Sequence, residues 1–177
     1  MIFKNNKICS LSIVKKRRFS HKRYRDYKKV KEIRRTIKGY YKGIVKYFPF
    51  ELNLSNFTNE QKSVYKAVLN VEYGHTITYK ELKNKLGFDI SYRRLSKILN
   101  ECPILILIPT HRVIRSNGQA GSFSINTEIK KSLLNIEKKE ANLMKKSIKT
   151  DDNVEITNID SGYSLGDLDF FKQYFNT

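Results

Sequence analysis

The stretch ILILIPTHRVIRSNGQAGSF, from Ile104 to Phe123, decides how the rest of the chain is interpreted. Five consecutive apolar residues, 104–108, cannot alternate between core and solvent, so they predict a strand buried on both faces. Pro109 fixes the backbone after them, and the polar triplet Thr110–Arg112 follows directly. Polar residues that a buried segment delivers to a fixed place indicate a site. A buried strand that merely ends in solvated residues explains this stretch equally well.

The charge of the chain is its most unusual bulk property. It has 177 residues, 40% of them hydrophobic, which is enough for one domain with a core. The formal net charge is +18; residues 1–50 hold 17 Lys and Arg against 2 acidic residues, whereas residues 142–177 have a net charge of −2. Such an excess in one third of the chain favours a polyanionic partner, nucleic acid before membrane, although a solvated basic segment without a partner also fits.

The cysteine content and the apolar runs limit which compartment, metal sites and membrane segments the chain is expected to have. Cys9 and Cys102 are too few for a disulfide framework or a zinc site, so we expect a reducing compartment and neither a metal nor a cofactor. No run reaches the roughly 18 apolar residues of a membrane span, and the N-terminus lacks the apolar core of a secretory signal. The expected protein is an intracellular monomer, in the cytoplasm or the nucleus, with no membrane partner.

The first 50 residues predict a small basic region. Two apolar runs around Asn5-Asn6-Lys7 predict a β-hairpin within residues 1–14. Residues 15–31 form a basic run with interspersed aromatic residues, either a flexible arm or a helix face that needs phosphates to settle. Apolar residues recurring every three or four positions predict an amphipathic helix over Glu32–Phe48, which Pro49 stops.

The middle of the chain predicts a helix-turn-helix. Capping boxes at Thr58-Asn59-Glu60-Gln61 and Thr78-Tyr79-Lys80-Glu81 each open a helix, and the second helix ends at Gly87. Ser91 or Asp89 caps the next helix, whose outer side carries Arg93, Arg94 and Lys97. Two short helices joined by a tight turn fit a DNA-binding motif, but helical hairpins and surface arginines are also common elsewhere.

The remaining signals complete the predicted architecture. Asn117-Gly118 predicts a turn that folds Val113-Ile114 back toward Phe123, and Thr127 predicts the cap of a last helix that frays near Lys145. The expected fold is α+β: a reduced N-terminal hairpin plus helix over residues 1–50, and a mostly helical, winged-helix-like C-terminal domain over residues 51–145. Residues 146–177 are expected to form an acidic tail with an aromatic patch.

At the central stretch the chain resembles a known family. IPTHRVI is similar to the PCHRV active-site motif of the O6-alkylguanine-DNA alkyltransferases, the methylated-DNA–protein-cysteine methyltransferases of direct DNA repair. The resemblance covers residues 57–137, and four other spaced motifs agree with it. They are the run YGHTITYKEL with Tyr79, an arginine fourteen residues later at Arg93, Gly121, and LLNIE ending at Glu137.

The resemblance implies roles for these residues. His111, oriented by Glu137, acts through a water as the base that ionises the acceptor, and Tyr79 hydrogen-bonds a flipped guanine. Arg93 enters the base stack and holds the place of the flipped nucleotide. Ser124 contacts the lesion oxygen, and the expected DNA-binding set is Arg93, Arg94, Lys97, Arg112 and Ser124. Three of these residues have a structural alternative. In that reading Tyr79 starts a helix with its ring packed, Glu137 is an exposed helical carboxylate, and His111 is a core histidine with its hydrogen bonds satisfied.

One departure from the motif decides the expected chemistry. The acceptor position, a cysteine in the family, is Thr110 here, and a threonine hydroxyl is far harder to ionise than a thiol. The resemblance is therefore nearest to the alkyltransferase-like proteins, which bind the lesion without alkyl transfer, and whether the chain is an enzyme stays open. The expected partner is double-stranded DNA with an alkylated guanine. Two alternatives are an active methyltransferase that uses Cys102, and a basic DNA-binding protein that flips no base.

Overall fold

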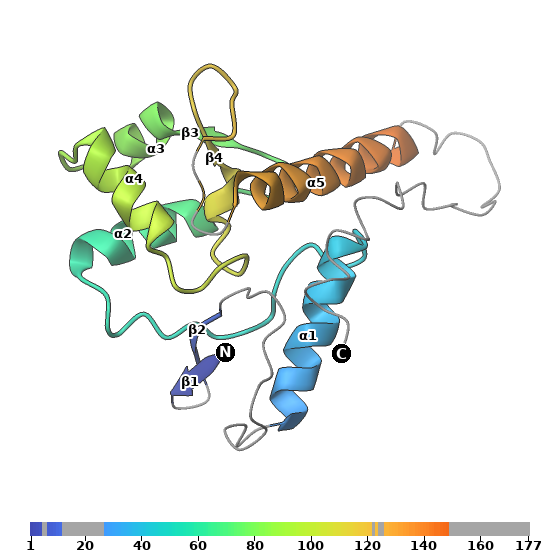
Figure 1. The fold of residues 1–177 in the computed structure, drawn as a ribbon. Coiled ribbons are helices and arrows are strands. Elements are labelled where there is room, and N and C mark those ends of the chain that lie inside the picture. Colours follow the sequence, from blue (N-terminus) through green and yellow to red (C-terminus); the bar gives the residue numbers. More distant parts are fainter. Residues whose placement is uncertain (5–6, 12–26, 122, 124–125, 149–177) are drawn as a thin grey trace.

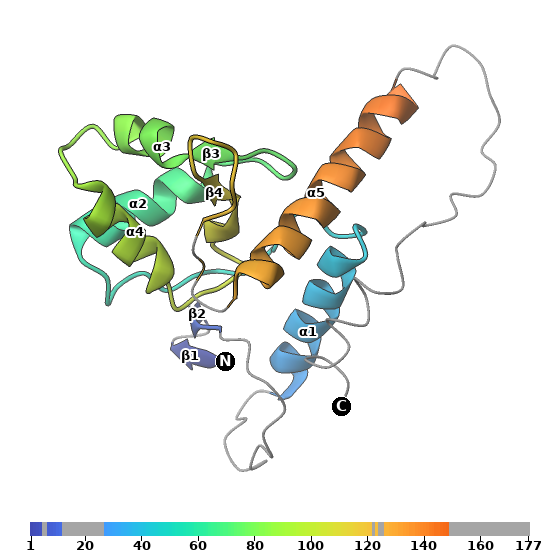
Figure 2. The ribbon, with the colours of Figure 1, turned by 45° about the horizontal axis from the view of Figure 1, so that its top comes forward.

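The computed structural model describes residues 1–4, 7–11, 27–121, 123 and 126–148. Three helices, α2 (Asn59–Leu69), α3 (Tyr79–Lys85) and α4 (Tyr92–Asn100), form a cluster on one side of the molecule (Figure 1). Helix α5 (Thr127–Ile148) projects from this cluster, and the C-terminal end of α1 (Tyr27–Tyr41) comes close to the middle of α5 in both ribbon views (Figure 2). The site described below lies where these parts meet.

The predicted N-terminal hairpin is confirmed. Strands β1 (Ile2–Lys4) and β2 (Lys7–Ser10) pair antiparallel. Backbone hydrogen bonds also connect the hairpin region to later segments. The Ile8 amide donates to the Glu51 carbonyl at 2.9 Å, and the Leu11 amide donates to the Pro103 carbonyl at 2.8 Å. The hairpin is thus tied to the apolar stretch before the site. Most of the predicted basic arm, residues 12–26, lies outside the described residues.

Helix α1 is shifted relative to its predicted bounds of Glu32–Phe48, because its apolar face extends back to Val30 and its C-terminus is set by a glycine. Gly43 has φ 70°, and its amide donates to the Tyr40 carbonyl while the Ile44 amide donates to the Gly39 carbonyl. These are the two bonds of a Schellman motif, which ends a helix at a residue in the left-handed conformation. The helix therefore stops at Tyr41, before Pro49 is reached.

The three helices of the cluster begin where their capping signals predict. Both capping boxes are present: the Thr58 and Thr78 hydroxyls accept from the amides of Gln61 and Glu81, each at 3.2 Å. Ser91, the first of the two candidates, caps α4. Each helix turns its apolar residues inward, so the helix-turn-helix pair α3–α4 rests on α2 over a common core.

The apolar run 104–108 is buried as predicted, but it is not a strand. Its five side chains are each 5% exposed or less. Instead of extending, the backbone turns tightly: Ile106 has φ 70°, and the Leu107 amide donates to the Leu105 carbonyl at 2.8 Å. A continuous apolar run indicates that the side chains are buried on every side, and both a compact buried loop and a central strand satisfy this condition.

The segment after the site also folds back. Strand β4 (Val113–Ile114) pairs in parallel with β3 (Ile77–Thr78), and the turn at Asn117-Gly118 is confirmed by the bond from the Arg115 amide to the Gln119 carbonyl at 2.9 Å. Helix α5 then begins at Thr127, but the capping side chain is that of Asn126, whose Oδ1 accepts from the Glu128 amide at 2.8 Å. The helix start is correct, and the predicted cap is wrong by one residue.

One core joins the N-terminal and C-terminal parts. It contains Ile8 of β2 and Ile33 of α1 together with Val64, Leu95 and Leu133. The architecture is α+β, as predicted, whereas the division at residues 50 and 145 stays a prediction. The acidic tail falls beyond residue 148, outside the described residues. Among the helices that the structure describes, none has the length and apolar character that crossing a membrane requires.

Candidate functional site

The triplet Thr110–Arg112 lies inside the protein as one turn of 3-10 helix. As whole residues, Thr110, His111 and Arg112 are 3%, 0% and 7% exposed. The turn is fixed by the Thr110 amide, which donates to the Ile108 carbonyl at 2.8 Å, and by the Arg112 amide, which donates to the Pro109 carbonyl at 2.9 Å. The buried loop thus delivers three polar side chains to one internal place, where each needs a partner.

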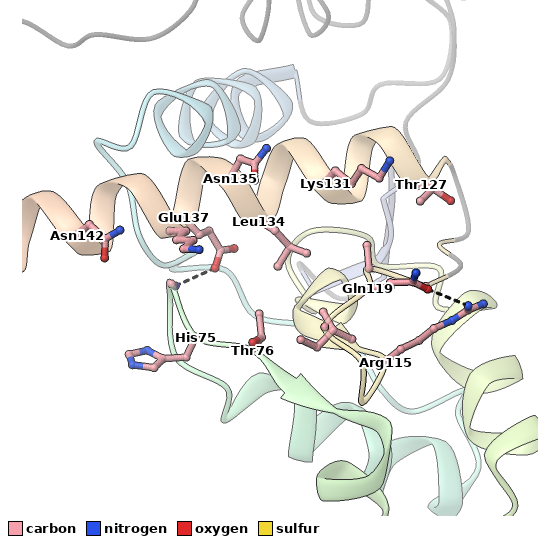
Figure 3. Close-up of a pocket in the computed structure, with 16 residues that line it drawn as sticks. His75, Thr76, Arg115, Gln119, Thr127, Lys131, Leu134, Asn135, Glu137 and Asn142 are labelled. Carbon is pink, nitrogen blue, oxygen red and sulfur yellow. Dashed lines mark hydrogen bonds between the residues drawn. The ribbon is translucent and has the colours of Figure 1, made fainter.

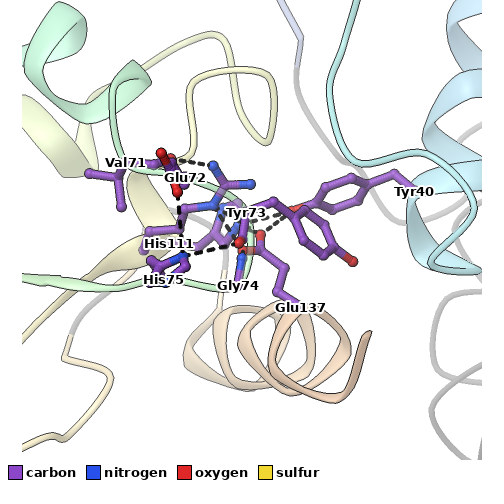
Figure 4. Close-up of polar contacts among 9 residues, drawn as sticks. Tyr40, Val71, Glu72, Tyr73, Gly74, His75, His111 and Glu137 are labelled. Atoms are coloured by element: carbon purple, nitrogen blue, oxygen red, sulfur yellow. Dashed lines mark hydrogen bonds and ion pairs between the residues drawn. The ribbon is translucent and has the colours of Figure 1, made fainter. Parts of the chain in front are cut away.

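Glu137, from the middle of α5, is the centre of the polar network at this place (Figure 4). His111 Nε2 lies 2.7 Å from Glu137 Oε1, and Arg112 Nε donates to Oε2 at 2.9 Å. The amide of Gly74 donates to Oε2 at 2.9 Å. Gly74 has φ 78°, and a Cβ there would lie 2.5 Å from the Cβ of Ala141, so only glycine lets this loop approach α5 closely enough to donate.

Tyr40 brings the N-terminal helix into the same network. Its hydroxyl, buried at the end of α1, donates to Glu137 Oε1 and lies 3.2 Å from His111 Nε2 (Figure 4). Tyr40 lies on the apolar face of the amphipathic helix that the sequence predicts over Glu32–Phe48, and this pattern does not predict the contact. The available signal was the hydroxyl itself, because a tyrosine buried on a helix face needs a partner for its oxygen.

The protonation states follow from these contacts. Burial by itself raises the pKa of Glu137, but the hydrogen bond from His111 and the charge of Arg112 outweigh it and bring the pKa to about 2. Burial lowers the pKa of His111 below its usual value. At neutral pH we therefore assign an ionised Glu137 and a neutral His111. The carboxylate has no proton to give, so the shared proton belongs to Nε2 and the Nδ1 atom of His111 is a base.

Two buried atoms of the triplet stand apart from this network. Among the described residues, neither Thr110 Oγ1 nor His111 Nδ1 has a hydrogen-bond partner. A neutral imidazole whose acceptor nitrogen is available beside a side chain is the arrangement that activates a nucleophile directly or through a water. The arrangement suits a thiol, whose pKa lies within reach of such a base, much better than it suits a hydroxyl.

The helix-turn-helix residues form a second, separate group on the surface. Arg93, Arg94 and Lys97 are exposed on α4. Arg94 is held by Glu60 of α2, with Nη2 at 2.6 Å and Nε at 2.9 Å from the same carboxylate oxygen, and Lys97 lies 3.8 Å from Glu101. Arg93 has no acidic side chain within ion-pair distance among the residues that the structure describes. Of these three side chains, Arg93 therefore needs to break no ion pair of the described residues in order to contact a ligand.

The other expected site residues are placed as follows. Tyr79 is half-buried at the start of α3, close to the backbone of Gly121. Ser124 lies outside the described residues. Arg112, expected to contact DNA, is instead buried, with Nη1 donating to the Val71 carbonyl at 2.6 Å and Nε engaged by Glu137. Its guanidinium fills the interior, so we do not retain it as a DNA contact.

The sequence of the chain is similar to those of known proteins of one family. A family model described as the DNA-binding domain of 6-O-methylguanine DNA methyltransferase matches residues 59–139. A methylated-DNA–protein-cysteine methyltransferase of Methanosarcina barkeri is 37% identical over 107 residues, which cover 60% of this chain and 67% of that protein. The chain belongs to the 6-O-methylguanine DNA methyltransferase family. Its family is thus one of DNA repair, and the matched range holds α2 to α4 and all of the network except Tyr40.

Solved structures agree with this membership. The crystal structure of Mycobacterium tuberculosis OGT in complex with DNA is similar with a TM-score of 0.57 and 30% identity, over 60% of this chain and 65% of that chain. The O6-methylguanine-DNA methyltransferase of Pyrococcus kodakaraensis KOD1 is similar with a TM-score of 0.50 and 33% identity, over 58% and 60% of the two chains. The similarity thus covers somewhat less than two thirds of these structures.

The alternative nucleophile Cys102 lies in the hydrophobic core. It is 3% exposed, and burial raises the pKa of its thiol to about 11. At neutral pH roughly one molecule in ten thousand then carries the thiolate, which is the reactive form. Cys102 has the environment of a structural cysteine.

Proposed function

We propose that this methyltransferase-family chain binds duplex DNA through α3 and α4 and takes a flipped O6-alkylguanine beside Thr110 without accepting its alkyl group. One observation carries the proposal. Thr110 directly precedes His111 in the buried 3-10 turn, and His111 is hydrogen-bonded to the Glu137 carboxylate as the base-and-carboxylate pair of a nucleophile-activating site is. The parts that would prepare an acceptor are in place, and the side chain they would prepare is an alcohol.

The chemistry of Thr110 supports recognition without transfer. A thiol has a pKa near 8.5, which a neighbouring base lowers into the working range, whereas a threonine hydroxyl ionises far less readily. The carbon that bears the hydroxyl is branched, which hinders approach to an alkyl carbon. Internal threonines also lack the terminal amine that serves N-terminal threonine nucleophiles as a base. His111 thus has little to activate in the wild-type chain.

The DNA side of the proposal rests on α4. Arg93 is exposed there and has an extended cationic side chain that can stack and donate several hydrogen bonds, as an occupant of a vacated base position requires. Tyr79, at the start of the neighbouring helix, is assigned to the flipped base. Arg94 and Lys97 are assigned to phosphates, and Ser124 to the lesion oxygen. The similarity to Mycobacterium tuberculosis OGT, whose crystal structure is of a complex with DNA, and to the methylated-DNA–protein-cysteine methyltransferase of Methanosarcina barkeri supports DNA as the partner.

Within this proposal Arg112 has a positioning role in place of DNA contact. Its guanidinium holds Glu137 ionised and oriented toward His111. The alternative of a working methyltransferase that uses Cys102 is disfavoured by the burial and raised pKa of that thiol. We therefore propose that no other described cysteine replaces the acceptor.

Binding and mass spectrometry on one set of samples test the proposal. The full chain is titrated with a duplex that carries one O6-methylguanine and with the same duplex undamaged, and the protein is then weighed. We expect tighter binding of the methylated duplex, no added methyl group, and loss of the preference in Arg93→Ala. A methyl adduct on any residue overturns the absence of transfer, and equal affinity for both duplexes indicates DNA binding without base flipping.

A further inference from the structure

A groove with a volume of about 1090 Å³ lies next to Glu137, between α5, the loop 74–76 and the turn 114–121 (Figure 3). Its walls are the loop 74–76, the turn 114–121 and one face of α5. The α5 residues on this face recur every three or four positions along the helix: Thr127, Lys131, Asn135, Lys138 and Asn142. The groove thus follows the helix over four turns.

The groove is positively charged. Arg115, Lys131 and Lys138 line it, and Lys131 has an ion pair with Glu128 at 3.0 Å. The one carboxylate in the lining is Glu137, whose charge is already engaged by Arg112 and His111. No acidic side chain among the described residues lies within ion-pair distance of Arg115 or Lys138. The lining therefore has an excess of cations over available anions.

A further cation lies beneath this lining. Lys130 is 1% exposed, and its ammonium donates to the Val113 carbonyl at 2.6 Å. Burial and the nearby charge of Arg115 lower the pKa of Lys130 to about 8. An anion bound at Arg115 would relieve this repulsion, so the interior also favours an anionic occupant of the groove.

The lining residues indicate what kind of anion fits. Besides the cations, the groove presents the amide and hydroxyl side chains of Thr76, Gln119, Asn135 and Asn142, which are types that contact phosphates in DNA complexes. None of the residues that line it is Phe, Tyr or Trp, the rings on which unpaired bases stack. Lys131 and Lys138 are about 10 Å apart along the helix axis, a span in which one DNA strand presents about three phosphates.

We propose that this groove binds the sugar–phosphate backbone of the duplex that α4 engages, in the segment flanking the flipped base. Gly121 lines the groove, and a Cβ on it would lie 3.9 Å from the Tyr79 ring at the start of α3, so the groove adjoins the start of α3. This inference rests on the proposed function for the presence of DNA. It adds a second contact region, which binds without regard to the lesion.

The slope of log affinity against log salt concentration tests the groove. Lys131→Gln/Lys138→Gln removes both α5 cations, and Lys131→Arg/Lys138→Arg keeps the charge. Arg35→Gln/Lys38→Gln removes the same charge from the exposed face of α1, which lies across α5 from the groove (Figure 3). We expect the groove double variant to lose about 2 units of slope, since each lost phosphate contact lowers the slope by about 0.9. The methylated and undamaged duplexes should weaken equally, and the two control variants should keep the wild-type slope.

Two outcomes overturn the groove proposal: an unchanged slope in the groove double variant, or an equal fall in the α1 variant, which would reflect net charge alone. The outcomes are separable from those of the proposed function. A wild-type chain that binds both duplexes equally contradicts lesion recognition, while the slope comparison on undamaged DNA still decides the groove. A groove variant that keeps its lesion preference but has a reduced slope supports both.

Discussion

Replacing Thr110 by cysteine should convert the site into an alkyl acceptor. The thiol enters a position beside a neutral His111 whose Nδ1 is unprotonated, while Glu137 holds the proton on the other nitrogen. About one tenth of a thiol with a pKa near 8.5 is ionised at pH 7.5 before any base acts on it. We expect Thr110→Cys to take one methyl group per chain from a methylated duplex, and the wild type to take none.

The same substitution should leave the fold intact or stabilise it. The buried Thr110 hydroxyl has no partner among the described residues, and burying an unpaired hydroxyl costs about 1–3 kcal/mol. Cysteine removes that cost but also removes one buried methyl group, worth about 1 kcal/mol. The net effect is between neutral and about 2 kcal/mol of stabilisation. In a chain of this size the midpoint of thermal unfolding rises by no more than about 8 °C.

Thr110→Ser is the matched control, because it removes the branching methyl group and keeps the hydroxyl. It should lose about 1 kcal/mol of stability and accept no methyl group. The assay is mass spectrometry of the protein after incubation with the methylated duplex, alongside thermal unfolding of all three forms. A Thr110→Cys variant that binds the lesion with wild-type affinity and stays unmethylated would contradict this expectation. Methylation of Thr110→Ser would refute the argument from hydroxyl ionisation.

Three other perturbations have defined outcomes. Tyr40→Phe removes a hydrogen bond to a buried carboxylate and should lower the free energy of unfolding by about 1.5–3 kcal/mol in urea titrations; no loss would mean that Glu137 is satisfied without it. Glu137→Gln leaves Arg112 buried without its counter-charge and should cost about 3–5 kcal/mol in the same assay. The pKa of Glu137 is about 2 in the folded protein and 4.5 in the unfolded chain, so its ionisation stabilises the fold by about 3 kcal/mol above pH 4.5, and this contribution is lost as the pH falls toward 2. An acid titration in which Glu137→Gln and the wild type lose equal stability would contradict this assignment. Arg94→Gln removes a cation assigned to a phosphate, so the slope of duplex binding against salt concentration should fall by about 1 unit, and an unchanged slope would show that Arg94 makes no phosphate contact.

The parts of the fold that were predicted correctly depend on local rules. The capping boxes at Thr58 and Thr78 involve residues three positions apart, so the sequence contains the whole interaction. The turn at Asn117-Gly118 is similarly local. The errors arose where burial was visible but the shape of the backbone was not. The run 104–108 has the same apolar composition as a central strand, and only the packing around it makes it a loop.

The candidate site was predicted in part, as the pair His111 and Glu137, and its remaining contacts were not. The pairing of His111 with Glu137 followed from the family resemblance, and the structure places His111 Nε2 2.7 Å from Glu137 Oε1. Tyr40 and the inward direction of Arg112 could not be predicted, because both depend on how α1 and the 3-10 helix face α5 across large separations in the chain. The roles of these residues in DNA recognition stay predictions.

The buried network around Glu137 has a consequence for how such chains change over evolutionary time. Exchange of the neutral side chain at position 110 changes the free energy of unfolding by about 2 kcal/mol or less. Loss of Glu137 leaves Arg112 buried without its counter-charge and costs about 3–5 kcal/mol. Selection for folding alone therefore suffices to retain Glu137 and Arg112 in a lineage that has abandoned alkyl transfer. Their presence is poor evidence that a family member is active, and position 110 is the informative one.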